Sequence, residues 1–121
     1  MDLNEFCMFM HLAQFAGFIL PFANIALPII MWFTNKDKSE IINQHGKYIL
    51  NWMISSFVYT LVIIFVIFSL IFGNFSILII IGAFTMLAVA IICSIIFIII
   101  GTINAYNGEL YKYPLTISFI K

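Results

Sequence analysis

The sequence contains no arginine, and its 121 residues include only five lysines and five acidic residues. Charged residues therefore make up 8% of the chain, whereas a soluble domain carries about 25%. A chain of this length folded in water would leave more than about a third of its surface exposed. So few charges cannot cover that surface. Because 64% of the residues are hydrophobic, we expect lipid to solvate most of the chain.

Signals for catalysis or nucleic-acid binding are also scarce. The formal net charge is zero, so the chain lacks the basic face of a nucleic-acid-binding protein. No apolar segment contains paired carboxylates, and no serine-nucleophile, phosphate-loop or zinc-protease motif occurs. We therefore expect a protein that is not an enzyme and binds no cofactor. Its expected partners are the lipid bilayer and either another membrane protein or a second copy of itself.

Two long helices are predicted in the second half of the chain. From Tyr48 to Gly108 there is no Asp, Glu, Lys, Arg or His. This stretch is long enough to cross a hydrocarbon core of about 30 Å twice. Its only turn signal is Gly73-Asn74-Phe75-Ser76. The pattern predicts transmembrane helices over about 47–72 and 76–107.

The first apolar stretch, from Phe6 to Phe33, contains two prolines. Proline interrupts a helix because it removes a hydrogen bond and clashes with the preceding turn. Two interpretations remain open. The stretch forms either one span kinked at Pro21 or a short hairpin with helices over about 5–19 and 24–34. In both cases the chain is a single all-α membrane domain, whose last two helical segments are long.

A polar loop and the distribution of lysines predict the orientation. Residues 35–46 form the polar segment, which we expect to be a surface loop with a short helix capped by Ser39. The positive-inside rule places the lysine-rich side in the cytoplasm. We therefore expect an inner-membrane protein with a cytoplasmic loop 35–46 and a cytoplasmic C-terminus. Residues 113–121 are expected to form an interfacial tail. After Pro114, residues 115–121 alternate apolar and polar side chains, which is typical of a strand-like or interfacial segment. The lysines are Lys36, Lys38, Lys47, Lys112 and Lys121.

Polar residues follow one face of the third predicted segment. Residues four apart lie on the same side of a helix, and this spacing separates Lys47, Asn51, Ser55 and Tyr59. In lipid, such a polar stripe turns inward to find hydrogen-bond partners. Two interpretations remain open: the stripe holds helices together, or it forms a groove for a substrate or a partner segment.

Small residues mark one face of the last predicted helix. Gly82, Ala90 and Ser94 lie at multiples of four residues, and small residues at this spacing allow helices to approach closely. The packing partner is either the third segment or a second chain. His11 and Cys7 also share a helix face, but a metal site typically needs about four ligands. We therefore expect no metal site, and instead a hydrogen bond between His11 and a neighbouring helix.

Several short motifs run in order through nearly the whole chain. They are His11-Leu12; Pro21-Phe22-Ala23-Asn24-Ile25 with Pro28 and Trp32; Lys36-Asp37; His45-Gly46-Lys47 with Leu50-Asn51; and Asn107-Gly108-Glu109-x-Tyr111-x-Tyr113-Pro114-Leu115. Together they resemble a bacterial family of small membrane proteins of unknown function, described as similar to Tic-twenty, a component of the chloroplast inner-envelope import machinery. The magnetosome proteins MamF and MmsF look like members. The chain departs from the usual pattern at Ala23, where glycine is frequent, and at Met53, where glutamine is frequent.

The resemblance implies four helices with both chain ends on one side, which favours the hairpin and a cytoplasmic N-terminus. It also implies that two motifs meet at the cytoplasmic face, as a packed junction or as a docking surface. We predict a non-enzymatic accessory or scaffold subunit of a larger membrane complex, in protein translocation or membrane organisation. The alternatives are a homo-oligomeric channel or carrier lined by the polar stripe, and a membrane immunity or stress protein. The residues of the two motifs are His45, Gly46, Asn107, Gly108, Glu109, Tyr113 and Pro114.

Overall fold

The computed structural model describes residues 2–120 and, among them, every side chain except that of Phe18. Its elements are helices, and no strand occurs within residues 2–120. The predicted all-α fold, with two short segments followed by two long helices, is confirmed. The elements are α1 (Leu3–Leu12), η1 (Ala13–Phe18), α2 (Ala23–Asn35), α3 (Glu40–Phe72) and α4 (Ile77–Tyr106).

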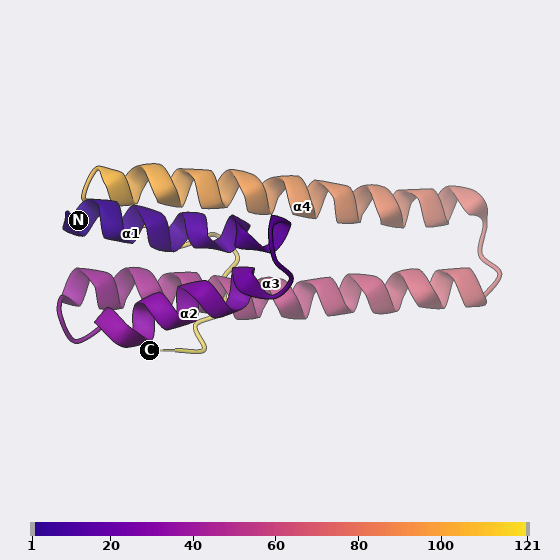
Figure 1. The fold of residues 1–121 in the computed structure, drawn as a ribbon. Coiled ribbons are helices and arrows are strands. Elements are labelled where there is room, and N and C mark those ends of the chain that lie inside the picture. The colour runs from indigo at the N-terminus through magenta and orange to yellow at the C-terminus, as the bar shows by residue number, and fades with distance from the viewer. Residues whose placement is uncertain (1, 121) are drawn as a thin grey trace.

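The first apolar stretch is a hairpin, because α1 and η1 run antiparallel to α2 (Figure 1). The chain reverses at residues 19–22, where Pro21 cannot continue a helix. Phe22 completes the turn in the left-handed conformation, with φ 67°. The alternative of a single kinked span is therefore excluded. Pro28 lies inside α2 and is buried.

The two long helices also form an antiparallel hairpin (Figure 1). Ser39 caps α3 by accepting a hydrogen bond from the amide of Ile41, as expected. The helix begins at Glu40, however, and not near residue 47. The predicted loop 35–46 is therefore wrong in extent, since only residues 36–39 separate α2 from α3. The cap and the absence of proline after it allow residues 40–46 to form the first turns of α3.

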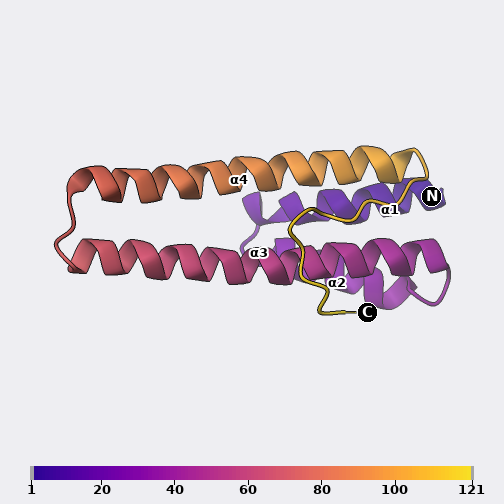
Figure 2. The ribbon, with the colours of Figure 1, turned by 180° about the vertical axis from the view of Figure 1, so that it is seen from behind.

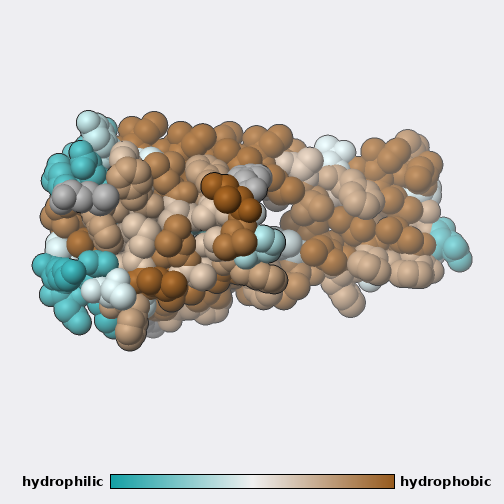
Figure 3. Space-filling view, in the orientation of Figure 1, coloured by the Kyte–Doolittle hydropathy of each residue, from teal (hydrophilic) through white to brown (hydrophobic). Residues whose placement is uncertain are grey.

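Both long helices are apolar enough to cross a membrane. Their most hydrophobic stretches are only 11% and 6% buried within the chain, so they are not the core helices of a soluble protein. Figure 3 shows that hydrophobic residues cover most of the visible face, while hydrophilic residues gather mainly at one end. A surface of this kind is compatible with lipid on all sides.

The hairpin of α1, η1 and α2 covers only one half of α3 and α4 (Figures 1 and 2). The molecule therefore has a four-helix end and a two-helix end. The N-terminal residues, the 36–39 loop and the end of α4 lie together at the four-helix end. After α4 the chain runs back between α4 and α3 as an extended tail and then crosses α3 (Figure 2). Lys121, the last residue of the predicted tail, lies outside the described residues.

The buried core is concentrated at the four-helix end. α1 packs mainly against α4, and α2 packs against η1 and α3. The cluster of buried side chains includes residues from α1, α3, α4 and the tail. Its members are Cys7, Met10, Ile42, Ile49, Trp52, Ile98, Ala105 and Tyr113.

Candidate functional site: a buried histidine–tyrosine network and a bound tail

Three titratable side chains meet in the core of the four-helix end. Nδ1 of His11 in α1 lies 2.5 Å from Oη of Tyr113 in the tail. Nε2 of His11 lies 3.0 Å from Nδ1 of His45 in α3. Gln14 in η1 donates from its side-chain amide to the same Tyr113 oxygen over 2.9 Å. The two histidines and Tyr113 are at most 1% exposed, so the network is closed to solvent.

The hydrogen bonds define the direction of the network. Because the Tyr113 oxygen accepts from Gln14, its O–H is available to donate to Nδ1 of His11. His11 then carries its proton on Nε2 and donates to Nδ1 of His45. With these tautomers both ring nitrogens of His11 and the Tyr113 oxygen have partners, and no buried side-chain nitrogen or oxygen lacks one within residues 2–120.

Packing holds the Tyr113 ring in this position. The ring stacks on Trp52 of α3, with centroids 5.5 Å apart and planes 7° from parallel. Gly101 of α4 leaves the space that the network needs, since a Cβ there would lie 2.7 Å from Nδ1 of His11. Burial raises the pKa of the Tyr113 phenol well above its ordinary value of 10.0, which keeps it a hydrogen-bond donor.

The network joins α1, η1, α3 and the tail. The expected bond from His11 to a neighbouring helix is confirmed, with His45 as the partner. Sequence reasoning missed His45 and Tyr113 as these partners. The available signal was that His11 is ionisable within an apolar segment, where such a group needs a partner. No group of three or more His, Cys, Asp or Glu residues suited to a metal occurs among the described residues.

The polar stripe on α3 binds the backbone of the tail. The Asn51 amide donates to the carbonyl of Ile120 over 3.0 Å and accepts from its N–H over 2.7 Å. Ser55 accepts from the amide of Ile117 over 2.9 Å. Tyr59 donates to the carbonyl of Leu115 over 2.5 Å.

The predicted stripe is therefore occupied by the chain itself, through Asn51, Ser55 and Tyr59. Its fourth member, Lys47, is half-buried one turn before Asn51 and makes none of these bonds. The predicted interfacial tail is therefore bound by side chains of α3 within residues 113–120. The stripe bonds to the backbone of the tail and not to its side chains, and the side chains of Ile117 and Phe119 remain about half exposed.

The two motifs expected at one face separate into buried and exposed parts. Gly46 packs under Trp32, where a Cβ would lie 1.9 Å from the indole Cδ1. The Trp32 indole donates to the Asn43 side chain over 3.1 Å, and Lys36 Nζ lies 4.9 Å from the Trp32 ring centroid. His45, Gly46 and Tyr113 are thus packing residues. Asn107, Glu109 and Pro114 are exposed, and Gly108 makes the turn after α4 with φ 80°.

The small residues of α4 differ in their surroundings. Gly82 is exposed, and a Cβ built there would meet nothing within 4 Å. Gly82 therefore makes no close helix contact within this chain. Ala90 and Ser94 instead line a cavity between α3 and α4, together with Trp52 and Phe97.

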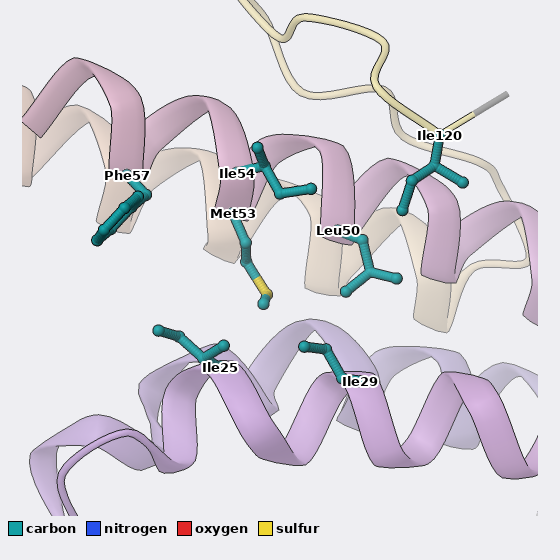
Figure 4. Close-up of a pocket in the computed structure, with 7 residues that line it drawn as sticks. All are labelled: Ile25, Ile29, Leu50, Met53, Ile54, Phe57 and Ile120. Atoms are coloured by element: carbon teal, nitrogen blue, oxygen red, sulfur yellow. The ribbon is translucent and has the colours of Figure 1, made fainter.

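An apolar pocket lies between α2 and the first half of α3. It measures about 360 Å³. Figure 4 shows Ile25 and Ile29 of α2 facing Met53 and Leu50 of α3, with Ile120 of the tail at one edge. Because Asn51 holds the backbone of Ile120, the tail contributes to the wall of this pocket.

The fold and its polar contacts define a small helical membrane protein whose buried polar groups bond within its own chain. A model of the magnetosome magnetite crystal formation protein family, MamF/MmsF, matches residues 2–120, and the chain belongs to this family. The predicted likeness to MamF and MmsF is thereby confirmed, while the likeness to Tic-twenty stays a prediction. No curated protein and no solved structure matches the chain.

Proposed function

We propose that this protein acts by association within the membrane, as a non-enzymatic scaffold or accessory subunit of a larger membrane assembly. The family is described as a magnetosome magnetite crystal formation protein family, which supports placing the assembly in that process. In this proposal the four-helix end is a self-contained unit. The two-helix end is the surface that meets another membrane protein.

The two-helix end is the observation that carries the proposal. Beyond the hairpin, α3 and α4 are accompanied by no further helix of the described chain (Figure 1). Phe65 and Met86 are 73% and 65% exposed there. Gly82 offers open space for a close helix approach. Lipid solvates such a surface, but small and large apolar residues side by side also allow tight packing against another helix.

The four-helix end supports a structural role for the polar residues. Asn51, Ser55 and Tyr59 bond to the tail, so the path that a channel would need along this stripe is filled by the chain itself. His11, His45 and Tyr113 bond to one another and are closed to solvent. These groups stabilise the fold instead of presenting a reactive face.

Site-specific photocrosslinking tests the association. A photoreactive amino acid replaces Phe65 or Met86 in the protein expressed in its native membrane. The matched control is Ile19, which is 90% exposed but lies at the turn of the hairpin. We expect a discrete adduct with a larger membrane protein at Phe65 or Met86 and none at Ile19. Adducts with lipid alone at all three positions contradict the proposal. In a second experiment, the purified protein alone in liposomes should not reproduce its physiological activity, and the proposal fails if it does.

We also propose that the protein resides in the cytoplasmic (inner) membrane with its four-helix end toward the cytoplasm. Lys36 and Lys38 lie in the loop at that end, and the turn at residues 73–76 carries no charge. Cysteines introduced one at a time at Asp37 and Asn74, both exposed, test this orientation in a chain that lacks Cys93 and keeps only the buried Cys7. A membrane-impermeant maleimide added to intact cells should label Asn74→Cys and spare Asp37→Cys. The reverse pattern contradicts the orientation.

A further inference from the structure

A polar cavity lies where the hairpin meets the seam between α3 and α4. It measures about 280 Å³, and no acidic or basic side chain is among the described residues that line it. A second cavity of about 240 Å³ adjoins it, because the two share Ser56, Thr60 and Ser94. The polar lining of the first cavity comes from four helices and consists of Gln14, Asn24, Ser56, Thr60 and Ser94.

Several of these polar groups lack a hydrogen-bond partner within residues 2–120. The side chains of Asn24, Thr60 and Ser94 form no hydrogen bond in that part of the chain. Gln14 uses its amide N–H groups on Tyr113, at 2.9 Å, and on the carbonyl of His11, at 3.4 Å. The side-chain carbonyl oxygen of Gln14 therefore remains an unpaired acceptor. The two bonds of the amide nitrogen fix the orientation of this group. Hydrocarbon cannot satisfy such groups, whereas a polar molecule in the cavity can.

The apolar pocket of Figure 4 adjoins the polar cavity. The two share Ile25, Met53 and Phe57 as lining residues. Figure 4 shows Ile25 and Met53 facing each other across the space between α2 and α3. Methionine is unbranched and adapts its shape to a neighbour, so Met53 suits a boundary that a flexible molecule crosses. A polar and an apolar compartment thus lie side by side on the surface of the bundle.

We propose that these adjoining cavities bind a neutral amphiphile, a lipid-like molecule with a hydroxyl group and a hydrocarbon chain. The hydroxyl enters the polar cavity and the chain fills the apolar pocket. A hydroxyl donates to the free carbonyl oxygen of Gln14 and accepts from Ser94 or Thr60. A charged headgroup does not fit, because the lining supplies no opposite charge to compensate its loss of water.

Photolabelling of the full-length protein in lipid nanodiscs tests the site, with a diazirine-bearing hexadecanol as the probe. We expect labelling that saturates and maps to lining residues of α2 and α3. Unlabelled hexadecanol should compete, whereas hexadecane, which lacks only the hydroxyl, should not. The double variant Thr60→Val, Ser94→Ala should weaken competition about fivefold, as expected for one or two lost hydrogen bonds.

The matched control is Thr85→Val on α4. The Thr85 hydroxyl bonds the carbonyl of Ile81 in its own helix over 2.9 Å and lines neither cavity. This variant should bind hexadecanol like the unaltered protein. Labelling that rises linearly without saturation, or equal competition by hexadecane, overturns the proposal and reduces the site to ordinary lipid contact. The comparison of hexadecanol with hexadecane uses the unaltered chain, so it tests the proposed site even if the double variant does not fold.

Discussion

Tyr113 and His11 lie 102 residues apart in the chain, yet Oη of one and Nδ1 of the other are 2.5 Å apart. Their bond connects the tail to the first helix. Through Nε2 of His11, the same ring also bonds to His45 in α3. Three separate segments are therefore held together by one imidazole, and the stability of the four-helix end should depend on it.

Tyr113→Phe should destabilise the protein by about 1–3 kcal/mol. The change removes one hydroxyl but keeps the ring that stacks on Trp52. It leaves Nδ1 of His11 without its partner and removes one of the two acceptors of the Gln14 amide. Thermal unfolding in detergent, followed by circular dichroism, measures the effect. Tyr111→Phe is the control, because Tyr111 contacts the Tyr113 ring edge-to-face and is less buried. Equal melting temperatures for the two variants would show that the network contributes nothing.

Two glycines of α4 should respond oppositely to the same substitution. Gly101→Ala places a methyl group 2.7 Å from Nδ1 of His11 and 3.0 Å from Oη of Tyr113, which should cost about 1–3 kcal/mol of stability. Gly82→Ala meets open space and removes a flexible residue from a helix, so it should be neutral or stabilise by up to about 1 kcal/mol. The same unfolding experiment compares them. A tolerated Gly101→Ala would contradict the close approach of α1 to α4.

The bonds between the stripe and the tail should be visible in hydrogen exchange. The amides of Ile120 and Ile117 donate to Asn51 and Ser55, so both should exchange slowly although the tail is not helical. Asn51→Leu should accelerate exchange at Ile120 about tenfold, through loss of one to two hydrogen bonds. Exchange by NMR in nanodiscs measures each amide separately.

The matched control for the tail is Ser69→Ala. The Ser69 hydroxyl bonds the carbonyl of Phe65 within α3, beyond Tyr59, the last residue of the stripe that bonds the tail. This variant should leave exchange at Ile117 and Ile120 unchanged. Fast exchange at both amides in the unaltered protein would mean that the tail does not lie on the stripe.

Alkaline pH should destabilise the protein through Tyr113. Burial raises the pKa of this phenol above 10.0, so the folded chain keeps a proton that the unfolded chain loses. The associated stability is complete below pH 10 and decreases as the pH rises above it. Unfolding measured from pH 8 to 12 should show this decline, and the decline should be smaller in Tyr113→Phe. Equal slopes for the two proteins would contradict the assignment.

The sequence predicts the long helices because lipid demands a simple pattern. A stretch from Tyr48 to Gly108 without charge must cross the bilayer as helix, and Gly73 marks its turn. The start of α3 is harder to predict from the sequence, because the polarity of residues 40–46 shows only that they lie outside the hydrocarbon. Polarity does not distinguish a loop from a helix that projects into water.

The candidate site can be predicted from the sequence only in part. The four-residue spacing of Asn51, Ser55 and Tyr59 identifies an inward face, but it cannot identify the occupant. The occupant is a tail about 60 residues away that binds through its backbone, which carries no sequence pattern. His11, His45 and Tyr113 follow no common period, so only the folded chain brings them together.

The half-length hairpin of α1, η1 and α2 has a mechanical consequence for the bilayer. In a bilayer crossed by the two long helices, we expect one leaflet to accommodate four helical segments and the other only two. The molecule is therefore a wedge that displaces unequal lipid areas from the two leaflets. A bilayer relieves such an imbalance by bending, with the more crowded leaflet on the convex side. Because many copies in one patch would add their effects, we expect the local density of this small protein and the curvature of its membrane to be coupled.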